Sequence, residues 1–307
     1  MIHRTRATAK DWPRTRVLHG VTGGLDITPQ LAEQHLDALT DIVARAAAVT
    51  LATPFHSVAR RIKTDLTPVT AADEASEALI VDGLARLLPG LPVIAEEGAA
   101  RKLPPSLGSS FVIVDPLDGT REFLAGRDEF TVNVAIITGG VPIAGLIAAP
   151  ARGLLWRGIV GRGAERLHLR LGSGQTSVLA KAYGRTPIHT RPAPGRLTVA
   201  TSRSHLDENT EDFLARLPLA KRYLCGSSVK FCYLAQGEAD IYPRLSPTRE
   251  WDVAAGCAIL AAAGGCVTTP QGGPLPFGRL KQKFLVPGFI AMGDPSIQGS
   301  LPAVTAN

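Results

Sequence analysis

The N-terminal part of the chain carries two hydrophobic patterns with the period of a helix. The first predicted helix opens at Thr28-Pro29, because a capping hydroxyl followed by proline suits a helix start. Its apolar face continues to about Thr50 through residues three or four positions apart, namely Leu36, Leu39, Val43 and Ala46. The second helix spans 70–88 and is stopped by Pro89-Gly90. The segment 63–69 between them is expected to be extended or looped.

Short apolar runs after these helices predict strands. They lie at 91–95, 111–114, 130–137 and 141–149. Gly139-Gly140 between the last two predicts a hairpin turn. The run at 111–114 is rich in β-branched residues and ends abruptly at Asp115-Pro116, since proline cannot continue a central strand.

The pattern changes after residue 157. Residues 157–196 are rich in Gly, Arg and Pro with weak patterning, which indicates sheet edges and a connector at a domain boundary. Beyond them, strands are predicted at 197–201 and 239–242, and helices at 209–217, 228–236 and 250–263. We therefore expect an α/β fold in two parts: an α+β domain at 28–160 and an α/β domain at 197–298, with 161–196 as connector. Residues 299–307 would form a tail.

The first 27 residues carry five basic side chains against two acidic ones and show no regular period. This bias superficially resembles an organelle transit peptide, but no apolar core supports secretion. We expect a disordered tail, or a start codon assigned too far upstream.

Composition excludes several classes of protein. The 307 residues are 45% hydrophobic and 20% charged, as in ordinary globular proteins. The apolar stretch 143–155 is too short, and too broken by Pro150 and Arg152, to span a bilayer. The four cysteines form no Cys-x-x-Cys pair, which argues against zinc or a disulfide scaffold and favours reduced thiols in the cytoplasm. The net charge of +6 permits an anionic ligand, but basic residues do not cluster with aromatics, so nucleic-acid binding is not expected.

The sequence DPLDGT at 115–120 is the strongest chemical signal in the chain. Asp115 and Asp118 would share one tight turn, followed by the amides of Gly119 and Thr120. Hard oxygen ligands beside an amide-rich step suit Mg²⁺ and a phosphate together. An ordinary Asp-rich surface turn is the alternative.

Other carboxylates also lie at the ends of predicted elements. They are Glu96-Glu97 after a strand, Asp73 at a helix start and Asp252 at another helix start. Each has a structural alternative: a solvated loop for the glutamates, a capping box with Thr70 for Asp73, and the helix dipole for Asp252. If they converge, their repulsion requires cations, and two or three Mg²⁺ held by carboxylates, waters and a backbone carbonyl would supply them. Such a cluster suits hydrolysis, since one ion lowers the pKa of a water and another stabilises the leaving oxygen.

The sequence shows no local motif for other kinds of catalytic or nucleotide-binding site. The seven histidines are dispersed, and neither a P-loop nor a Gly-x-Gly-x-x-Gly fingerprint is present.

The three motifs EE at 96–97, DPLDGT at 115–120 and WDVAAG at 251–256 together resemble the lithium-sensitive, Mg²⁺-dependent phosphatase superfamily that includes inositol monophosphatases. Finer features are similar to the CysQ-type 3′(2′),5′-bisphosphate nucleotidases. They are TPVTAAD at 67–73, TREF at 120–123, SRSH at 202–205, GSSVKFC at 226–232, YPR at 242–244 and PGF at 287–289. The resemblance covers about residues 30 to 292; 161–195 matches poorly, and Arg121 replaces the lysine common in the family.

The resemblance implies a role for each motif residue. Metal would be bound by the carboxylates of Glu96, Asp115, Asp118 and Asp252 and by the backbone carbonyl of Leu117. Asp73 and Thr120 would position and deprotonate the attacking water, while the Gly119 and Thr120 amides would hold the scissile phosphate. The nucleotide side of the pocket would comprise Gly226, Ser227, Ser228, Lys230 and Arg244. Arg121, Glu96, Asp118 and Asp252 would also contact the substrate.

The residue chemistry fits these roles. A bisphosphate has a second anionic group, and Lys230 and Arg244 offer positive charge for it. Ser228 at a helix start adds backbone donors. The structural alternatives are a solvated helix face for Lys230 and an ion pair for Arg244.

The resemblance implies a layered α-β-α-β-α fold with its site in the cleft between the halves. The expected reaction converts adenosine 3′,5′-bisphosphate to AMP and phosphate by direct attack of a metal-bound water, without a phosphoenzyme. It would serve sulfate assimilation in the cytoplasm, or peripherally at the inner membrane, as a monomer or homodimer. The alternatives are an inositol or sugar monophosphatase and, from another class, a non-catalytic nucleotide or metal sensor.

Overall fold

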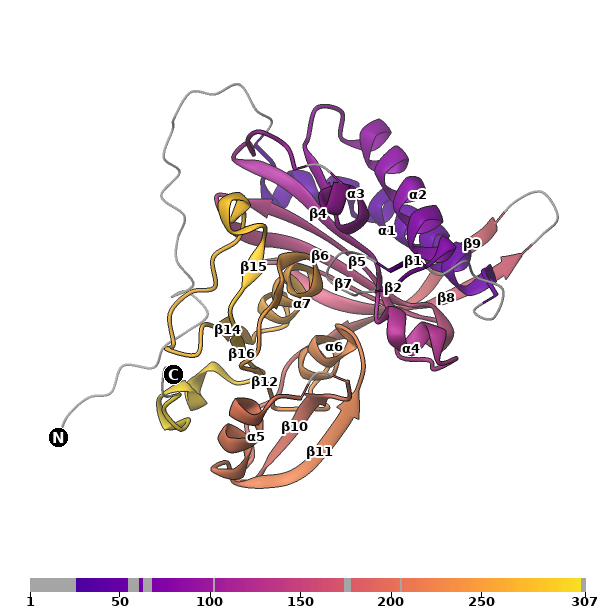
Figure 1. Cartoon of the computed structure of the whole chain (residues 1–307). Helices are drawn as coiled ribbons and strands as arrows, with labels where there is room; N and C mark the ends of the chain where they lie inside the picture. Colours follow the sequence, from indigo (N-terminus) through magenta and orange to yellow (C-terminus); the bar gives the residue numbers. More distant parts are fainter. Residues whose placement is uncertain are drawn as a thin grey trace.

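The computed structural model describes residues 26–54, 61–62, 68–101, 103–173, 178–204 and 206–304. Three layers of helices alternate with two β-sheets, as the predicted α-β-α-β-α arrangement requires (Figure 1). The basic segment 1–25, residues 63–67, His205 and residues 305–307 lie outside the described residues, so the predictions made for them are not addressed by this structure.

The first sheet has seven strands in the order β3-β4-β5-β6-β7-β8-β9. Their bounds are β3 Val93–Ala95, β4 Ser110–Asp118, β5 Thr131–Thr138, β6 Val141–Ala149, β7 Leu154–Ile159, β8 Gly163–Ser173 and β9 Val178–Ile188. β3 runs parallel to β4, and every later pair is antiparallel. The predicted turn at Gly139-Gly140 joins β5 and β6. The weakly patterned region from 157 onward is mostly the edge of this sheet, and only 189–196 connects it to the next strand.

Two long helices cover the outer face of this sheet. They are α1 (Pro29–Ala52) and α2 (Ala71–Leu87), and the short pair β1 (Arg61–Ile62) and β2 (Pro68–Val69) lies between them in the chain. The helix start at Thr28 is confirmed, since its hydroxyl accepts a hydrogen bond from the Leu31 amide at 3.2 Å. Ile27, placed in the predicted tail, is buried and donates its amide to Ser110 Oγ, so the ordered fold begins slightly earlier than predicted.

The second sheet has five strands in the order β11-β10-β12-β16-β14. Their bounds are β10 Leu197–Ser202, β11 Leu219–Cys225, β12 Ile241–Arg244, β14 Cys266–Thr268 and β16 Phe289–Met292. The helix α5 (Glu208–Ala215) packs on the outer face through Phe213 and Leu214. Leu301 and Val304, in the predicted C-terminal tail, pack against the same cluster.

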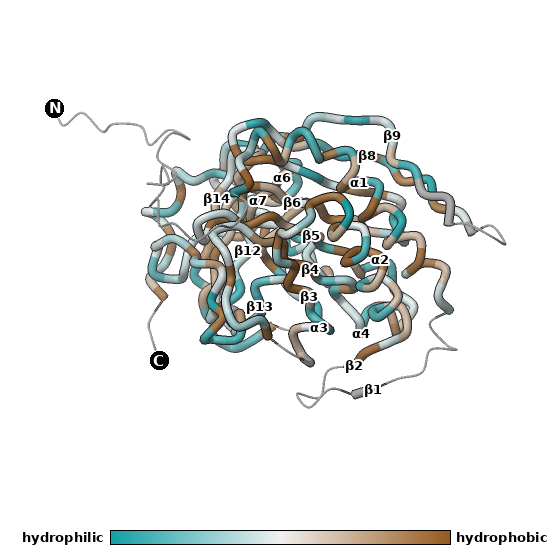
Figure 2. Tube along the Cα trace, turned by 90° about the horizontal axis from the view of Figure 1, so that it is seen from above, coloured by the Kyte–Doolittle hydropathy of each residue, from teal (hydrophilic) through white to brown (hydrophobic). Residues whose placement is uncertain are grey.

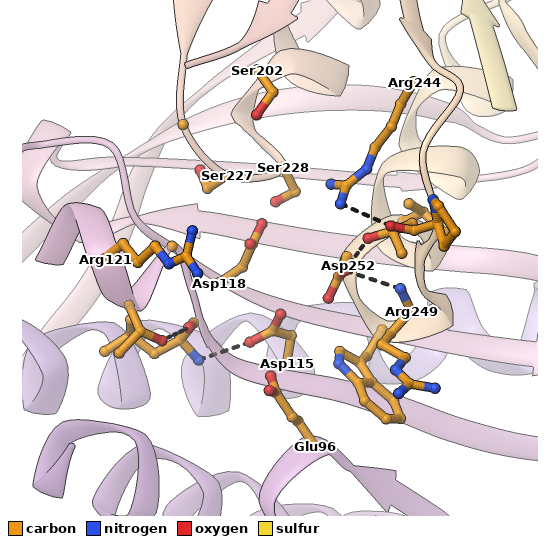
Figure 3. Close-up of a pocket in the computed structure, with 18 of the residues that line it drawn as sticks. Glu96, Asp115, Asp118, Arg121, Ser202, Ser227, Ser228, Arg244, Arg249 and Asp252 are labelled. Atoms are coloured by element: carbon orange, nitrogen blue, oxygen red, sulfur yellow. Dashed lines mark hydrogen bonds between the residues drawn. The ribbon is translucent and has the colours of Figure 1, made fainter. Parts of the chain in front are cut away.

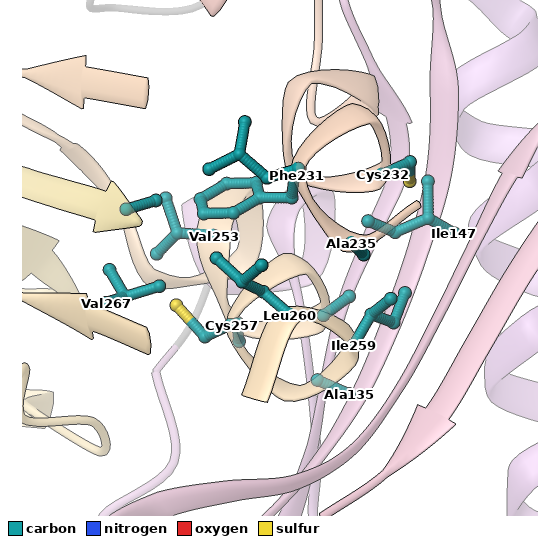
Figure 4. Close-up of a cluster of buried hydrophobic side chains, with 14 of the residues drawn as sticks. Ala135, Ile147, Phe231, Cys232, Ala235, Val253, Cys257, Ile259, Leu260 and Val267 are labelled. Atoms are coloured by element: carbon teal, nitrogen blue, oxygen red, sulfur yellow. The ribbon is translucent and has the colours of Figure 1, made fainter. Parts of the chain in front are cut away.

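The helices α6 (Val229–Ala235) and α7 (Glu250–Ala262) form the middle layer. Their side chains contribute to one buried cluster with residues of both sheets, including Phe231, Ile259 and Val267 (Figure 4). Burying apolar surface on both sides is the main force holding the two sheets together. Hydrophobic residues accordingly concentrate along the central strands and α7, whereas the β8–β9 edge is largely hydrophilic (Figure 2).

Short elements complete the fold. They are α3 Glu96–Arg101, α4 Thr120–Leu124, β13 Thr248–Arg249, β15 Leu285–Val286 and the 3-10 helices η2 Pro150–Arg152, η3 Leu280–Gln282 and η4 Pro295–Ser300. The solvated-loop alternative for Glu96-Glu97 is wrong, because both glutamates open α3. All four cysteines are buried and free. Among the helices of the described residues, none has the length and hydrophobicity to cross a membrane.

Candidate active site

A cavity of about 900 Å³ opens between the first sheet, α7 and the second sheet. Every predicted site residue except Asp73 lines it: Glu96, Asp115, Leu117, Asp118, Gly119, Thr120, Arg121, Gly226, Ser227, Ser228, Lys230, Arg244 and Asp252. The surface-turn alternative for DPLDGT is wrong, since Asp115 is only 1% exposed. The fold therefore brings together residues that are far apart in the sequence.

Four carboxylates converge on one side of the cavity. Glu96 comes from α3, Asp115 and Asp118 from the end of β4, and Asp252 from the first turn of α7 (Figure 3). Burial, and next the charge of Glu96, raises the pKa of Asp115 well above its ordinary range. Burial, and next the charge of Asp252, raises the pKa of Asp118 to about 7. Like charges in a desolvated space are unfavourable, and this wall consequently favours a cation or protons.

The turn that carries two of these carboxylates is fixed by the sheet beneath it. Asp115 pairs with Asn133 on β5, and Asp118 pairs with Thr131, with a register shift between the two pairs. Asp115 Oδ1 accepts a hydrogen bond from the Leu117 amide at 3.0 Å. The turn is thus a bulge in a central strand, the kind of irregularity that redirects side chains beside active sites.

Asp73 lies beside the cavity and reaches it through Thr120. The Thr120 hydroxyl lies 3.3 Å from Asp73 Oδ1 and 3.3 Å from the Leu117 carbonyl. The predicted capping box is also present, since Asp73 Oδ2 accepts from the Thr70 amide at 2.7 Å. The structural and the proposed catalytic role of Asp73 are therefore compatible, one for each carboxylate oxygen.

Asp252 is held in the first turn of α7, as predicted. Its Oδ2 accepts hydrogen bonds from the Thr248 hydroxyl and from the Arg249 amide, the latter at 3.1 Å. The helix start thereby fixes a carboxylate beside Asp118 on the acidic side of the cavity (Figure 3).

The donor chemistry of the acidic wall suits a hard cation. Carboxylate oxygens and the carbonyl of Leu117 are the ligand types that Mg²⁺ takes. Across the residues that the structure describes, no three His, Cys, Asp or Glu side chains stand close enough to hold a metal ion. The four carboxylates share a cavity, and their mutual repulsion is the property that a divalent cation would offset.

Lys230 forms part of the opposite wall. It is 2% exposed, so the solvated-face alternative is wrong. Its ammonium donates to the carbonyls of Cys225, at 3.2 Å, and Ser227, and lies 5.1 Å from the centre of the Tyr242 ring. Lys230 therefore supports the loop 225–228 from within while adding positive charge to this wall.

Arg244 approaches the cavity from β12 (Figure 3). Its Nη2 donates to the Pro247 carbonyl at 3.1 Å. Within the described part of the chain, its buried Nε has no hydrogen-bond partner. A buried donor without a partner is costly, and an anionic ligand in the cavity would satisfy it.

Ser228 contributes to the cavity mainly through its backbone. Its amide donates to Asp118 and opposes the rise in the pKa of that carboxyl. Its hydroxyl faces the first sheet, donating to Asn133 Oδ1 at 2.8 Å and bonding Thr131 Oγ1 at 2.8 Å. Its neighbour Ser227 adopts a positive φ of 49°, an uncommon conformation for serine.

The sequence reasoning missed several residues around the cavity. Trp251, Arg249 and Lys283 line it, together with Ala99 and Leu103 near α3. Thr131 and Asn133 hydrogen-bond Ser228 from below. They are buried polar residues in an otherwise apolar strand, and this pattern could have indicated their role from the sequence.

A fold of two sheets and three helical layers, with carboxylates at the end of β4 and the start of α7, is the arrangement of a class of phosphatases. The family model described as "Inositol monophosphatase family" matches residues 31–299, and the chain belongs to this family. The predicted resemblance is confirmed.

Individual members of the family give a more specific comparison than the family as a whole. The "3′(2′),5′-bisphosphate nucleotidase CysQ" proteins of Shigella flexneri and Escherichia coli K12 are 38% and 39% identical over 227 residues, or 74% of this chain and 86% of each relative. The crystal structure of CysQ from Bacteroides thetaiotaomicron is 30% identical, with a TM-score of 0.67, covering 86% of this chain and 98% of that one. An inositol monophosphatase from Anabaena is 26% identical, with a TM-score of 0.66 over 89% of this chain and 98% of that one.

Proposed function

We propose that this chain is a Mg²⁺-dependent 3′(2′),5′-bisphosphate nucleotidase that converts adenosine 3′,5′-bisphosphate to AMP and phosphate. The proposal rests on one observation: acidic and basic side chains line opposite walls of the same cavity. The acidic wall suits cations and the phosphate they bind, whereas Lys230 and Arg244 offer charge to a second anion. The names of the CysQ relatives support the same substrate class.

The metal side would use the four carboxylates and one carbonyl. Glu96, Asp115, Asp118 and Asp252, with the carbonyl of Leu117, would hold two or three Mg²⁺. The ions would lower the pKa of a bound water and neutralise charge on the phosphate.

The remaining chemistry would come from the chain itself. The Thr120 hydroxyl, bonded to Asp73, would orient the attacking water and pass its proton to that carboxylate. The Gly119 and Thr120 amides would bind the scissile phosphate. Gly119 has a positive φ of 91°, a conformation that glycine adopts without strain, and the chain turns there. Arg121 would contact the substrate from the same turn.

The second phosphate would be held on the opposite wall. Arg244 would donate its unpartnered Nε and Lys230 would contribute its charge, while Gly226, Ser227 and Ser228 would shape the nucleotide side. An inositol or sugar monophosphate has only one phosphate and would leave Arg244 unsatisfied, which favours the bisphosphate.

The cellular setting follows from the substrate. Adenosine 3′,5′-bisphosphate is the expected by-product of sulfuryl transfer, so we propose a link to sulfate assimilation. The proposal includes a cytoplasmic enzyme with a small phosphorylated nucleotide as its partner, acting as a monomer or homodimer.

A substrate panel tests the proposal. Phosphate release would be measured with Mg²⁺ on adenosine 3′,5′-bisphosphate and on inositol 1-phosphate, at matched enzyme concentrations and with EDTA as the blank. We expect a higher kcat/KM on the bisphosphate and no release with EDTA. A tenfold preference for inositol 1-phosphate would overturn the proposed substrate. If neither compound is hydrolysed, the result would favour the alternative of a non-catalytic sensor.

A further inference from the structure

A buried glutamate ties the two walls of the cavity together. Glu129 lies just before β5, in the N-terminal half, and is 8% exposed. Its carboxylate accepts two hydrogen bonds from the Arg203 guanidinium, at 2.8 and 2.9 Å, and one from the Gly226 amide at 2.9 Å. Arg203 and Gly226 follow β10 and β11, two parallel strands of the second sheet. One side chain thus bonds both strand ends that border the nucleotide side.

The backbone of Glu129 brings the same two walls into contact. A Cβ added at Gly119 would lie 2.9 Å from the Glu129 carbonyl oxygen, and one added at Gly226 would lie 2.9 Å from that same oxygen. Neither position has room for a larger residue. The turn proposed to bind the scissile phosphate and the loop proposed to border the nucleotide therefore meet at one peptide group.

Arg203 and Glu122 extend this contact. Arg203 Nη2 also donates to the Leu224 carbonyl at 2.7 Å, so its guanidinium spans from Glu129 to β11. Glu122, in α4, accepts a hydrogen bond from the Ser204 hydroxyl and packs against Gly226. We call Glu122, Glu129, Arg203 and Ser204 the cavity latch.

We propose that the cavity latch is a positioning and specificity-determining element for the bisphosphate. This inference rests on the proposed function. The proposed metal ligands Glu96, Asp115 and Asp118 and the scissile-phosphate turn belong to the N-terminal half. The second half supplies Asp252 on α7 and the residues of the other wall, namely Gly226, Lys230 and Arg244. A substrate held at both phosphates requires the two walls at a fixed spacing, and a substrate held at one phosphate does not.

A second ion pair with one buried partner provides the contrast. Arg157 is 1% exposed and bonds Glu165 at 2.6 Å between β7 and β8. This pair lies on the first sheet alone, outside the residues that line the cavity. Breaking it should lower stability without changing the spacing of the walls.

The experiment compares Glu129→Gln and Arg203→Gln with the matched control Glu165→Gln in the full chain with Mg²⁺. KM and kcat would be measured on adenosine 3′,5′-bisphosphate and on inositol 1-phosphate, with thermal melting for each protein. We expect both latch variants to raise KM for the bisphosphate about tenfold. We expect kcat/KM on inositol 1-phosphate to stay within about threefold. The control should keep the wild-type ratio between substrates.

The double variant Glu129→Gln/Arg203→Gln sharpens the test. If Arg203 acts through Glu129, the double variant loses no more than either single variant. An equal loss on both substrates, or an unchanged ratio, would overturn the latch. If Glu129→Gln does not fold, Ser204→Ala removes only the bond to Glu122 and should still raise the bisphosphate KM selectively; an unchanged KM would also overturn it. A wild-type enzyme that does not prefer the bisphosphate would instead overturn the proposed function.

Discussion

The two walls of the cavity are built in opposite ways. The acidic wall consists of side chains at the ends of regular elements, with Asp115 and Asp118 on β4 and Asp252 on α7. The cationic wall combines Lys230 at the start of α6 and Arg244 at the end of β12 with the loop 225–228. Lys230 bonds the loop carbonyls of Cys225 and Ser227, and the distant Glu129 accepts a hydrogen bond from the Gly226 amide. The first wall is therefore set by local structure and charge, and the second by tertiary contacts.

The difference suggests a division of labour. On the proposed function, the acidic wall would carry the chemistry that any phosphate monoester needs, and its repelling carboxylates would gain most from a bound cation. The cationic wall would select among substrates and would gain most from a second anion. Substitutions in the acidic wall should therefore lower kcat, whereas substitutions in the cationic wall should raise KM.

The largest effect is expected from Asp115→Asn. Losing a central carboxylate of the acidic wall should lower kcat about a thousandfold or more on every phosphate substrate. Because burial and neighbouring charges oppose ionisation of Asp115, the metal-free variant should melt no lower than wild type. Phosphate release and thermal melting measure the two outcomes, with exposed Asp82→Asn as the control. Retained turnover would contradict the role of the acidic wall.

A smaller loss is expected from Thr120→Val, which keeps the shape but removes the hydroxyl bonded to Asp73. If Thr120 orients the attacking water and passes its proton to Asp73, as proposed, kcat should fall about a hundredfold. KM for the bisphosphate should change little. Asp73→Asn should add little to Thr120→Val if the two residues act as one unit, and full additivity of their effects would argue against the pair.

Arg244→Gln tests the other wall. We expect KM for the bisphosphate to rise about tenfold and kcat to fall little, since a charge-assisted contact to the second phosphate is lost. Inositol 1-phosphate should be hydrolysed as before. Arg222→Gln, a change to a surface ion pair on β11, is the matched control. A parallel loss on both substrates would place Arg244 on the scissile phosphate instead.

The smallest effect is a pH dependence of stability. The pKa of Asp118 in the fold is about 7, above its ordinary value of 3.8, so the folded chain binds more protons than the unfolded chain between these values. The metal-free protein should therefore lose stability as pH rises through 7. Mg²⁺ should raise the melting temperature by a few degrees more at pH 8 than at pH 6. An equal rise at both pH values would mean that the cation does not offset this repulsion.

The acidic wall was predictable because its signals are local. Asp115 ends an apolar β-branched run, and Asp73 and Asp252 stand where helices begin, so one-dimensional patterns place each at an element end. Their convergence was implied by the family resemblance, and charge chemistry predicted only that convergence would require cations. The start of α3 at Glu96 was missed, since a two-glutamate step after a strand does not distinguish a loop from a helix's first turn.

The cationic wall was less predictable because some of its contacts join segments far apart in the chain. The hydroxyl of Ser228 turns toward Asn133, 95 residues earlier. The burial of Lys230 depends on nearer groups, the 225–228 loop and Tyr242, whose packing is set by the fold. Glu129 carried no periodic signal at all. The strand β11 was missed for a related reason: an edge strand with exposed Lys221, Arg222 and Leu224 lacks the alternation of a half-buried strand.

The bulge between Asp115 and Asp118 also limits how the chain can vary in length. β4 is paired with β3 from Val112 to Val114 and with β5 up to Asp115, and the pairing with β5 resumes at Asp118 opposite Thr131. Deleting or inserting one residue there would turn every later side chain of the strand to the opposite face. At β9, which has a neighbour on one side only, a length change can be absorbed at the free edge. Insertions between related chains should therefore gather at the far edge of the sheet and be absent from the turn at 115–118.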